Sequence, residues 1–159
     1  GVLSLPMRAA LSARVARLSG GAEPGLEAEL TLTVANDVAV IEEAVNLVTR
    51  HLEANFVDRH SIRFNLHVAL TEALANAMLY GAGGVAEGIG VRVLFGRNAI
   101  EMEVTDAGEG FDPTGIPDPT LPEYRSRPNG RGLFLIQQLM DEVRFNAKGN
   151  CICMILRRD

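Results

Sequence analysis

The chain has 159 residues and a formal net charge of −5, with 47% hydrophobic and 22% charged residues. This length and composition are typical of one globular domain that can bury a full core. Its apolar runs fall far short of the ~18 residues that suggest a membrane-spanning helix, so a membrane span is excluded. The acidic balance argues against direct binding of nucleic acid, which requires a basic surface.

The residue inventory also excludes several kinds of catalytic site. The only lysine, Lys148, is followed by Gly149, whereas a phosphate-binding Walker loop requires serine or threonine at that position. The histidines at 51, 60 and 67 lack the four-residue spacing of a zinc-binding helix. Cys151 and Cys153 have no matching second pair, which favours two buried free thiols on a strand. Free thiols indicate a reducing compartment, and we expect a cytoplasmic protein.

Residues 1–26 are expected to form an N-terminal arm. The apolar residues that share one helical face of this arm are Met7, Leu11, Val15 and Leu18. An amphipathic helix over 7–18 is therefore one interpretation, and an arm that packs on a neighbour or frays is the other. Glycine and proline residues then interrupt the chain, and the compact domain is expected over 27–159.

A strand and two helices are predicted next. Leu30, Leu32 and Val34 alternate with threonines, which predicts a strand over 29–34. A helix is expected from residue 38 to about 56, with Asn36 or Asp37 as its cap. A second helix is expected from a Ser61 cap to about Gly81.

Residues 89–96 and 99–106 predict a β-hairpin whose turn is centred on Arg97 and Asn98. In this register Arg92 lies opposite Glu103, a favourable cross-strand pair. The apolar pairs on the other face are Val91 with Val104, Val93 with Met102, and Phe95 with Ile100.

The segment 112–129 holds five of the seven prolines and has no apolar period. A loop of this length in a compact domain is usually functional or disordered. Helical periodicity returns at Leu133 and continues to Met140, and two closing strands are predicted at 142–146 and 151–157. This order of elements favours an α+β two-layer sandwich, in which helices cover one face of a mixed, mostly antiparallel sheet.

The second helix carries the first candidate site. Asn65, Glu72 and Asn76 follow one edge of its apolar stripe, and Glu72 and Asn76 are one turn apart. An amide oxygen at Asn76 suits Mg²⁺, and a carboxylate at Glu72 can accept a proton from an attacking hydroxyl or orient it. A polar boundary row on a buried helix would give the same pattern.

The second candidate site follows the hairpin, in the segment 106–111 (DAGEGF). Asp106 shares strand parity with Met102 and Val104, so its carboxylate is expected to point toward the core, where it needs a donor from the protein or a ligand. Gly108 and Gly110 allow the backbone to approach a ligand closely. An Asp-Gly turn with a capping carboxylate is the alternative.

The third candidate site is the glycine-rich segment 129–133 (NGRGL) at the start of a helix. Free N–H groups and the positive end of the helix dipole at such a terminus favour phosphate binding. Arg125, Arg127 and Arg131 add positive charge nearby. A flexible loop followed by a helix start is the alternative.

The three segments in this order resemble the ATP site of the gyrase–Hsp90–histidine kinase–MutL superfamily. The stretch GRGLFLIQQLMDEV and the two strands after it resemble, more narrowly, the bacterial anti-sigma-factor serine/threonine kinases. The resemblance covers roughly residues 27–157. It implies the histidine kinase/Hsp90-like ATPase fold, with Mg²⁺ and ATP held between the second helix and a mobile lid at 112–129.

The resemblance also implies a role for each matching residue. Glu72 corresponds to the general base, Asn76 to the Mg²⁺ ligand, and Asp106 to the acceptor of the adenine amino group, with Gly108 and Gly110 beside the base. Residues Gly130, Arg131, Gly132 and Leu133 correspond to the phosphate side, with Arg125 or Arg127 as the γ-phosphate contact. Two positions depart from the family pattern: Tyr80 replaces a histidine, and Asn150 follows Gly149 where the family commonly has a threonine near the adenine.

By this resemblance the chain would be an ATP-dependent protein serine/threonine kinase that acts as an anti-sigma factor. Its substrate would be an anti-anti-sigma protein of the STAS type, a sigma factor would be the competing partner, and a homodimer would be expected. The alternatives are a non-catalytic nucleotide- or partner-binding module and the catalytic domain of a histidine kinase. A mismatch-repair or gyrase-type ATPase would require a further transducer domain.

Overall fold

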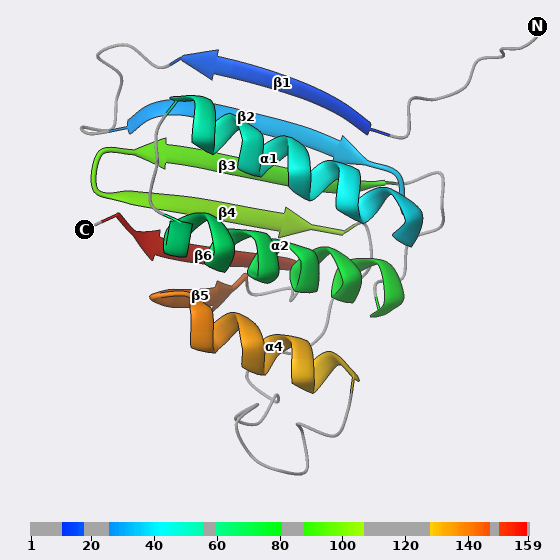
Figure 1. The fold of residues 1–159 in the computed structure, drawn as a ribbon. Coiled ribbons are helices and arrows are strands. Elements are labelled where there is room, and N and C mark those ends of the chain that lie inside the picture. The colour runs from blue at the N-terminus through cyan, green and yellow to red at the C-terminus, as the bar shows by residue number, and fades with distance from the viewer. Residues whose placement is uncertain are drawn as a thin grey trace, which may run out of the picture.

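A six-stranded sheet and three helices form two layers in the computed structural model (Figure 1). The structure describes residues 11–17, 26–55, 60–80, 88–106, 128–146 and 150–158. The strands are β1 Leu11–Arg17, β2 Leu26–Val34, β3 Ile89–Gly96, β4 Ala99–Thr105, β5 Glu142–Phe145 and β6 Cys151–Arg157. The helices are α1 Ile41–Asn55, α2 His60–Tyr80 and α4 Pro128–Leu139, and a 3₁₀ turn at Val38–Val40 precedes α1.

The strand order is β1-β2-β3-β4-β6-β5, and every neighbouring pair is antiparallel. The predicted α+β sandwich with helices on one face is therefore confirmed, with a sheet that is antiparallel throughout its described pairs rather than mixed. The predicted hairpin register is also confirmed, because Arg92 lies opposite Glu103 and Val93 lies opposite Met102. This register places the predicted apolar residues on the helix-covered face.

The helical interpretation of the N-terminal arm is wrong for residues 11–17, which form the edge strand β1. Leu11 pairs with Val34, and Val15 pairs with Leu30. The same apolar residues that are spaced for a helix also alternate with Ser12 and Arg14, which suits a strand. An isolated helix of this length is marginal in water, whereas pairing with β2 gives each backbone group a partner.

The helix starts differ in part from the predictions. Asp37 caps the turn before α1, since its Oδ1 accepts the Ala39 N–H at 3.0 Å. Ser61 is not the cap of α2, because that helix begins one residue earlier, at His60. Helix α4 begins at Pro128 rather than near Leu133. A proline is well suited to a first helical position because its missing N–H would have no partner there.

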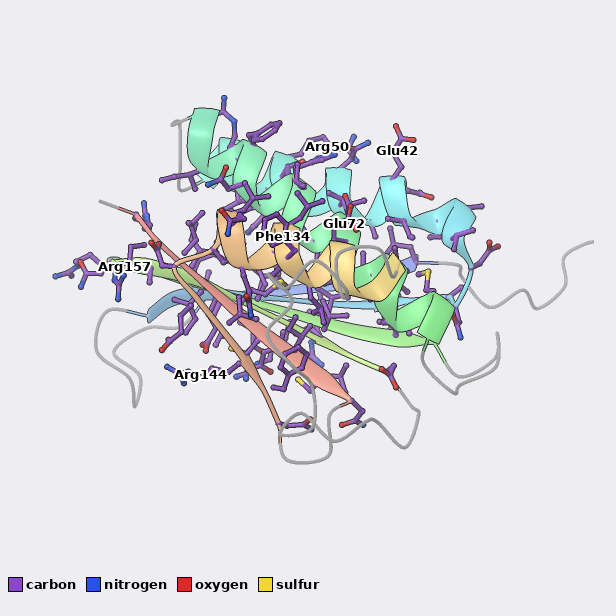
Figure 2. The ribbon with its side chains drawn as sticks, turned by 90° about the horizontal axis from the view of Figure 1, so that it is seen from below. Glu42, Arg50, Glu72, Phe134, Arg144 and Arg157 are labelled. Atoms are coloured by element: carbon purple, nitrogen blue, oxygen red, sulfur yellow. The ribbon has the colours of Figure 1, made fainter. Side chains whose placement is uncertain are left out.

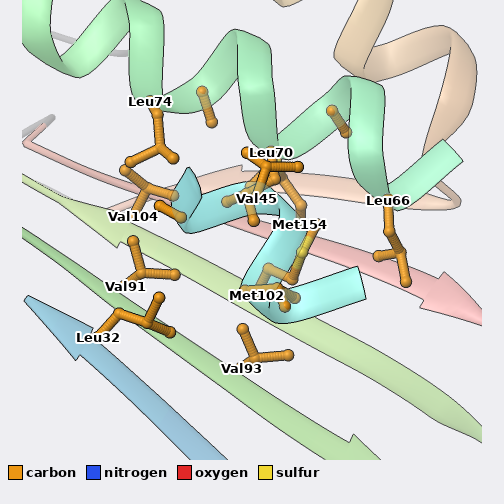
Figure 3. Close-up of a cluster of buried hydrophobic side chains, with 14 of the residues drawn as sticks. Leu32, Val45, Leu66, Leu70, Leu74, Val91, Val93, Met102, Val104 and Met154 are labelled. Carbon is orange, nitrogen blue, oxygen red and sulfur yellow. The ribbon is translucent and has the colours of Figure 1, made fainter. Parts of the chain in front are cut away.

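The core lies between the helices and the inner face of the sheet. In Figure 3, Leu66, Leu70 and Leu74 of α2 point toward the sheet, where they meet apolar residues of the central strands. The most fully buried large side chains include Phe95, Leu30, Leu32, Leu52, Ile100, Met102, Ile136 and Met154. No polar or charged residue of the described segments is buried. None of the described helices is long and apolar enough to cross a bilayer.

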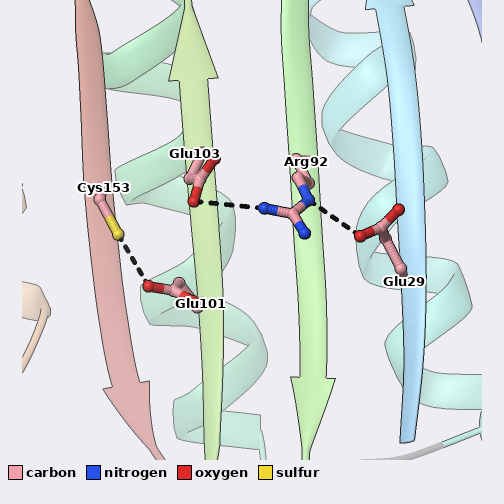
Figure 4. Close-up of polar contacts among 5 residues, drawn as sticks. All are labelled: Glu29, Arg92, Glu101, Glu103 and Cys153. Carbon is pink, nitrogen blue, oxygen red and sulfur yellow. Dashed lines mark hydrogen bonds and ion pairs between the residues drawn. The ribbon is translucent and has the colours of Figure 1, made fainter. Parts of the chain in front are cut away.

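The outer face of the sheet carries charged side chains in cross-strand pairs (Figure 4). Arg92 Nε lies 2.9 Å from Glu29 Oε2, and Arg92 Nη1 lies 3.7 Å from Glu103 Oε2. Such partly exposed pairs contribute about 0–1 kcal/mol each. They agree with the register that the buried apolar face sets.

Candidate functional site

Helices α2 and α4 lie side by side and run in opposite directions (Figure 1). Near the start of α2, the Asn65 Nδ2 donates a hydrogen bond to the carbonyl of Leu139 at 3.1 Å. This bond satisfies one of the carbonyls that the C-terminal end of α4 leaves without a partner inside the helix. The polar row predicted from the sequence therefore faces α4, and Asn65 attaches the C-terminal end of α4 to α2.

At the other end of the pair, Gly132 of α4 lies directly against Glu72 and Asn76 of α2. A Cβ at position 132 would lie 3.0 Å from Asn76 Nδ2 and 3.1 Å from Glu72 Oε2. Gly132 is buried, while Glu72 and Asn76 are half-buried. Figure 2 shows Glu72 among the labelled side chains of the helix layer. The structure thus brings together residues of the first and third candidate sites.

The side chains of Glu72 and Asn76 can bind a metal ion and accept a proton. The Glu72 carboxylate and the Asn76 amide are near neighbours on one side of α2, and their partial burial leaves both accessible to a ligand. Both supply oxygen atoms of the kind that Mg²⁺ prefers, so the donor set fits that ion. The carboxylate can also accept a proton from a hydroxyl placed beside it.

The glycine-rich segment differs from its sequence prediction in one respect. Gly130, Arg131 and Gly132 lie inside the first turns of α4 rather than in a loop before it. Only the N–H groups at the very start of α4 lack an acceptor within the helix, whereas Gly132 and Leu133 lie beyond its first four residues, so phosphate binding stays a prediction for the start of the segment. Leu133 is half-buried and packs against the core.

Asp106 follows the last residue of β4 and is half-buried rather than enclosed in the core. Its backbone N–H donates to the Asn150 carbonyl at 2.9 Å, and the Asn150 Nδ2 donates to the Asp106 carbonyl at 3.1 Å. The Asn150 Oδ1 in turn accepts from Asn146 Nδ2 at 2.8 Å. The side chain of Asn150 therefore links the end of β4 to the connection between β5 and β6.

Four of the predicted site residues, Gly108, Gly110, Arg125 and Arg127, lie outside the described residues. The predicted lid at 112–129 also lies outside them, except for Pro128 and Asn129, which belong to α4.

A group of potential metal ligands that the sequence did not indicate lies on the outer face of the sheet. It consists of Glu101, Glu103 and Cys153, whose ligand atoms lie within 4.8 Å of one another. Burial, and next the hydrogen bond from its Sγ to Glu101 Oε1 at 3.0 Å, raise the pKa of the Cys153 thiol to about 12. The thiol is therefore protonated at neutral pH, which disfavours metal binding. Both cysteines are free and half-buried, not buried as predicted.

A sequence profile described as "Histidine kinase-like ATPase domain" matches residues 33–156. This match spans most of the chain and includes the helices and strands that form the site. The chain therefore belongs to the histidine kinase-like ATPase family, and the superfamily resemblance of its three motifs is confirmed.

Individual relatives support the narrower resemblance to anti-sigma-factor kinases. The chain is 34% identical over 102 residues to the serine-protein kinase RsbW of Oceanobacillus iheyensis, an alignment covering 57% of the chain and 62% of that relative. It is 33% identical over 87 residues to RsbW of Listeria monocytogenes, covering 50% and 55%. It is 26% identical over 98 residues to the anti-sigma F factor of Pasteuria penetrans, covering 57% and 65%. The chain spans less than two thirds of the length of each of these relatives.

Proposed function

We propose that this protein binds Mg²⁺ and ATP beside Glu72, Asn76 and Gly132, and transfers the γ-phosphoryl group to a serine or threonine hydroxyl of a protein partner. The observation that supports this most directly is the close approach of Gly132 to the carboxylate of Glu72 and the amide of Asn76. It joins a possible proton acceptor and a possible metal ligand to a helix N-terminus, which is a favourable place for phosphate.

Each residue has a distinct part in this proposal. Asn76 holds the metal through its amide oxygen, and Glu72 accepts the proton of the incoming hydroxyl or orients that group. A bound Mg²⁺ would neutralise charge on the phosphates. The N–H groups in the first turn of α4 face the phosphates, and Arg125 or Arg127 adds positive charge. A bond forms between the hydroxyl oxygen and the γ-phosphorus, the bond from that phosphorus to the bridging oxygen breaks, and ADP leaves.

The base side of the site is assigned to Asp106, whose carboxylate would accept the adenine amino group, with Gly108 and Gly110 beside the base. Asp106 directly follows β4, and its backbone is held on both its N–H and its carbonyl by Asn150. A fixed backbone at this point would limit the orientations open to the carboxylate.

The partners are proposed from the relatives that carry kinase and anti-sigma names. The phosphorylated protein would be an anti-anti-sigma factor of the STAS type, and a sigma factor would be the competing partner. A homodimer in the cytoplasm completes the proposal.

The test compares two asparagines on neighbouring helices. Asn76→Ala is expected to lower the rate of phosphoryl transfer from labelled ATP by at least about 100-fold, because charge neutralisation by a metal is worth several kcal/mol. Asn46→Ala on α1 removes a half-buried amide elsewhere in the helix layer and is expected to leave the rate within about twofold. The measurement uses the purified chain with a STAS-type protein. Equal rates for Asn76→Ala and the parent would contradict the metal assignment.

A second candidate function is a nucleotide- or partner-binding module that transfers no phosphate. The Asn150 amide is hydrogen-bonded to Asp106 and Asn146, whereas the family commonly has a threonine near the adenine at position 150. This difference on the base side favours a binding module. Calorimetric titration with ATP distinguishes the two candidates. Heat of binding without phosphoryl transfer to any partner tested would support the module.

A further inference from the structure

A cluster of arginines lies at the end of the sheet opposite the candidate ATP site. Together with Asn98 and Ala99, the arginines Arg97, Arg157 and Arg158 line an open surface cavity of about 530 Å³. Arg97 and Asn98 form the turn between β3 and β4, and the two other arginines end β6 and follow it. Seven residues of β4 at ~3.3 Å each separate Ala99 from Asp106, so the cavity is roughly 23 Å from the proposed base side.

Arg158 is held in place by the sheet. Its backbone N–H donates to the carbonyl of Asn98 at 2.9 Å, and its Nη1 donates to the carbonyl of Gly96 at 2.6 Å. The residue is half-buried. A guanidinium fixed in this way loses less conformational freedom when it binds an anion than a mobile one does.

The other two arginines stand at the mouth of the cavity. Arg97 is exposed, and the Arg157 side chain is 66% exposed. Arg157 Nη1 lies 3.9 Å from Asp141 Oδ1, a long ion pair whose acidic partner is also partly exposed. Asp141 uses its other oxygen to accept the Arg157 backbone N–H at 2.6 Å. Among the described residues Asp141 pairs with Arg157, while Arg97 and Arg158 line the same cavity.

We propose that this cavity binds an acidic peptide segment of a partner protein, through carboxylates that engage Arg97, Arg157 and Arg158. Arginine pairs with carboxylates through two parallel hydrogen bonds, which gives both energy and orientation. The concentration of positive charge contrasts with the net charge of −5 on the whole chain, so an acidic segment would be guided to this place.

The shape and lining of the cavity favour a peptide over a small metabolite. Sites for small organic ligands are enclosed and mostly apolar. This cavity is lined by arginine, asparagine and a turn, and its mouth is formed by exposed side chains. An extended chain that lays two or more acidic side chains across the opening can reach all three arginines. The proposal does not depend on kinase activity, because no residue of the candidate ATP site takes part.

The test measures the binding of a fluorescein-labelled hexaglutamate peptide to the full chain by fluorescence anisotropy. The double variant Arg97→Gln/Arg157→Gln is expected to raise the Kd by at least about tenfold, since it removes charge-assisted hydrogen bonds to the peptide carboxylates. Arg158 is left unchanged because it also holds the sheet end. Thermal unfolding and ATP titration of the double variant are expected to match the parent.

Arg50→Gln provides the matched control, because Arg50 is an exposed arginine on α1 and the substitution removes one charge of the same kind. It is expected to change the peptide Kd by less than about twofold. No binding to the parent, or an equal loss in Arg50→Gln and the double variant, would overturn the proposal. Tighter binding of pyrophosphate than of the peptide at the same arginines would replace the peptide with a small phosphate ligand.

Discussion

Helices α1 and α2 cover the same face of one sheet, but their polar side chains have different uses. On α1, Thr49 Oγ1 and Arg50 Nε donate hydrogen bonds to carbonyls of α1 itself. On α2, Asn65 bonds to another element, and Glu72 and Asn76 approach a glycine of α4. Figure 2 shows Glu42 and Arg50 of α1 directed away from the sheet. Helix α2 contacts both α1 and α4, so its polar side chains can meet a second helix. They are therefore stronger candidates for a functional site than the polar side chains of α1.

The first prediction tests the hydrophobic core to which both α1 and α2 contribute. Leu52 of α1 and Leu70 of α2 are both fully buried. Leu52→Ala and Leu70→Ala are each expected to lower the free energy of unfolding by about 2–5 kcal/mol, through lost burial and a residual cavity. Denaturant unfolding measures this. Phe64→Ala, at a position 54% exposed, is the control and should change stability far less. A similar loss in all three variants would contradict the observed core.

The second prediction tests the contact between α2 and α4. Gly132→Ala would place a methyl group against Glu72 and Asn76, and overpacking costs about 1–3 kcal/mol. The higher helix propensity of alanine returns about 0.5–1 kcal/mol, so a net loss of about 0–2.5 kcal/mol is expected. The affinity for ATP, measured by calorimetry, should fall because the two side chains must move apart.

Gly90→Ala is the matched control for this substitution. An added Cβ there would lie 3.9 Å from the Thr105 carbonyl, which is an ordinary contact distance. Stability and ATP affinity should therefore stay close to those of the parent. If Gly132→Ala behaved in the same way, the close packing of Gly132 would have no importance for the site.

The third prediction tests the attachment of α4. Asn65→Ala removes the hydrogen bond to Leu139 and is expected to cost about 0.5–1.5 kcal/mol of stability. Hydrogen exchange should speed up most in the last turn of α4. Asn46→Ala on α1 should leave exchange in α4 unchanged. Equal exchange in the two variants would show that Asn65 has no special part in holding α4.

The sequence predicted the fold well wherever a periodic pattern and a charge pair agreed. In the β3–β4 hairpin, alternation fixed the buried face, and Arg92 opposite Glu103 fixed the register. The polar row on α2 could be predicted from helical spacing alone. Its use could not, because the position of α4 depends on contacts between residues far apart in the chain, such as Asn65 with Leu139.

The failures have physical causes of their own. The apolar spacing of Leu11 and Val15 suits either a helix or a strand, and only the available edge of β2 decides between them. The sequence pattern predicts too late a start for α4 because two glycines disfavour helix locally, whereas packing against Glu72 and Asn76 favours a residue without a side chain at position 132. The family profile shows that the chain belongs to the histidine kinase-like ATPase family. The residue roles remain predictions.

The hydrogen bond from Asn65 holds the C-terminal end of α4, and the buried Ile136 packs the middle of the helix against the core. Leu139 and Gly132 are seven residues apart, which corresponds to roughly 10 Å along the helix axis. If α4 tilts about its tethered end, Leu139 stays almost still while Gly132 swings through the full arc, so a tilt of about 10° shifts Gly132 by roughly 2 Å. A small tilt at the Asn65 end is therefore enlarged at the end of α4 that packs against Glu72 and Asn76.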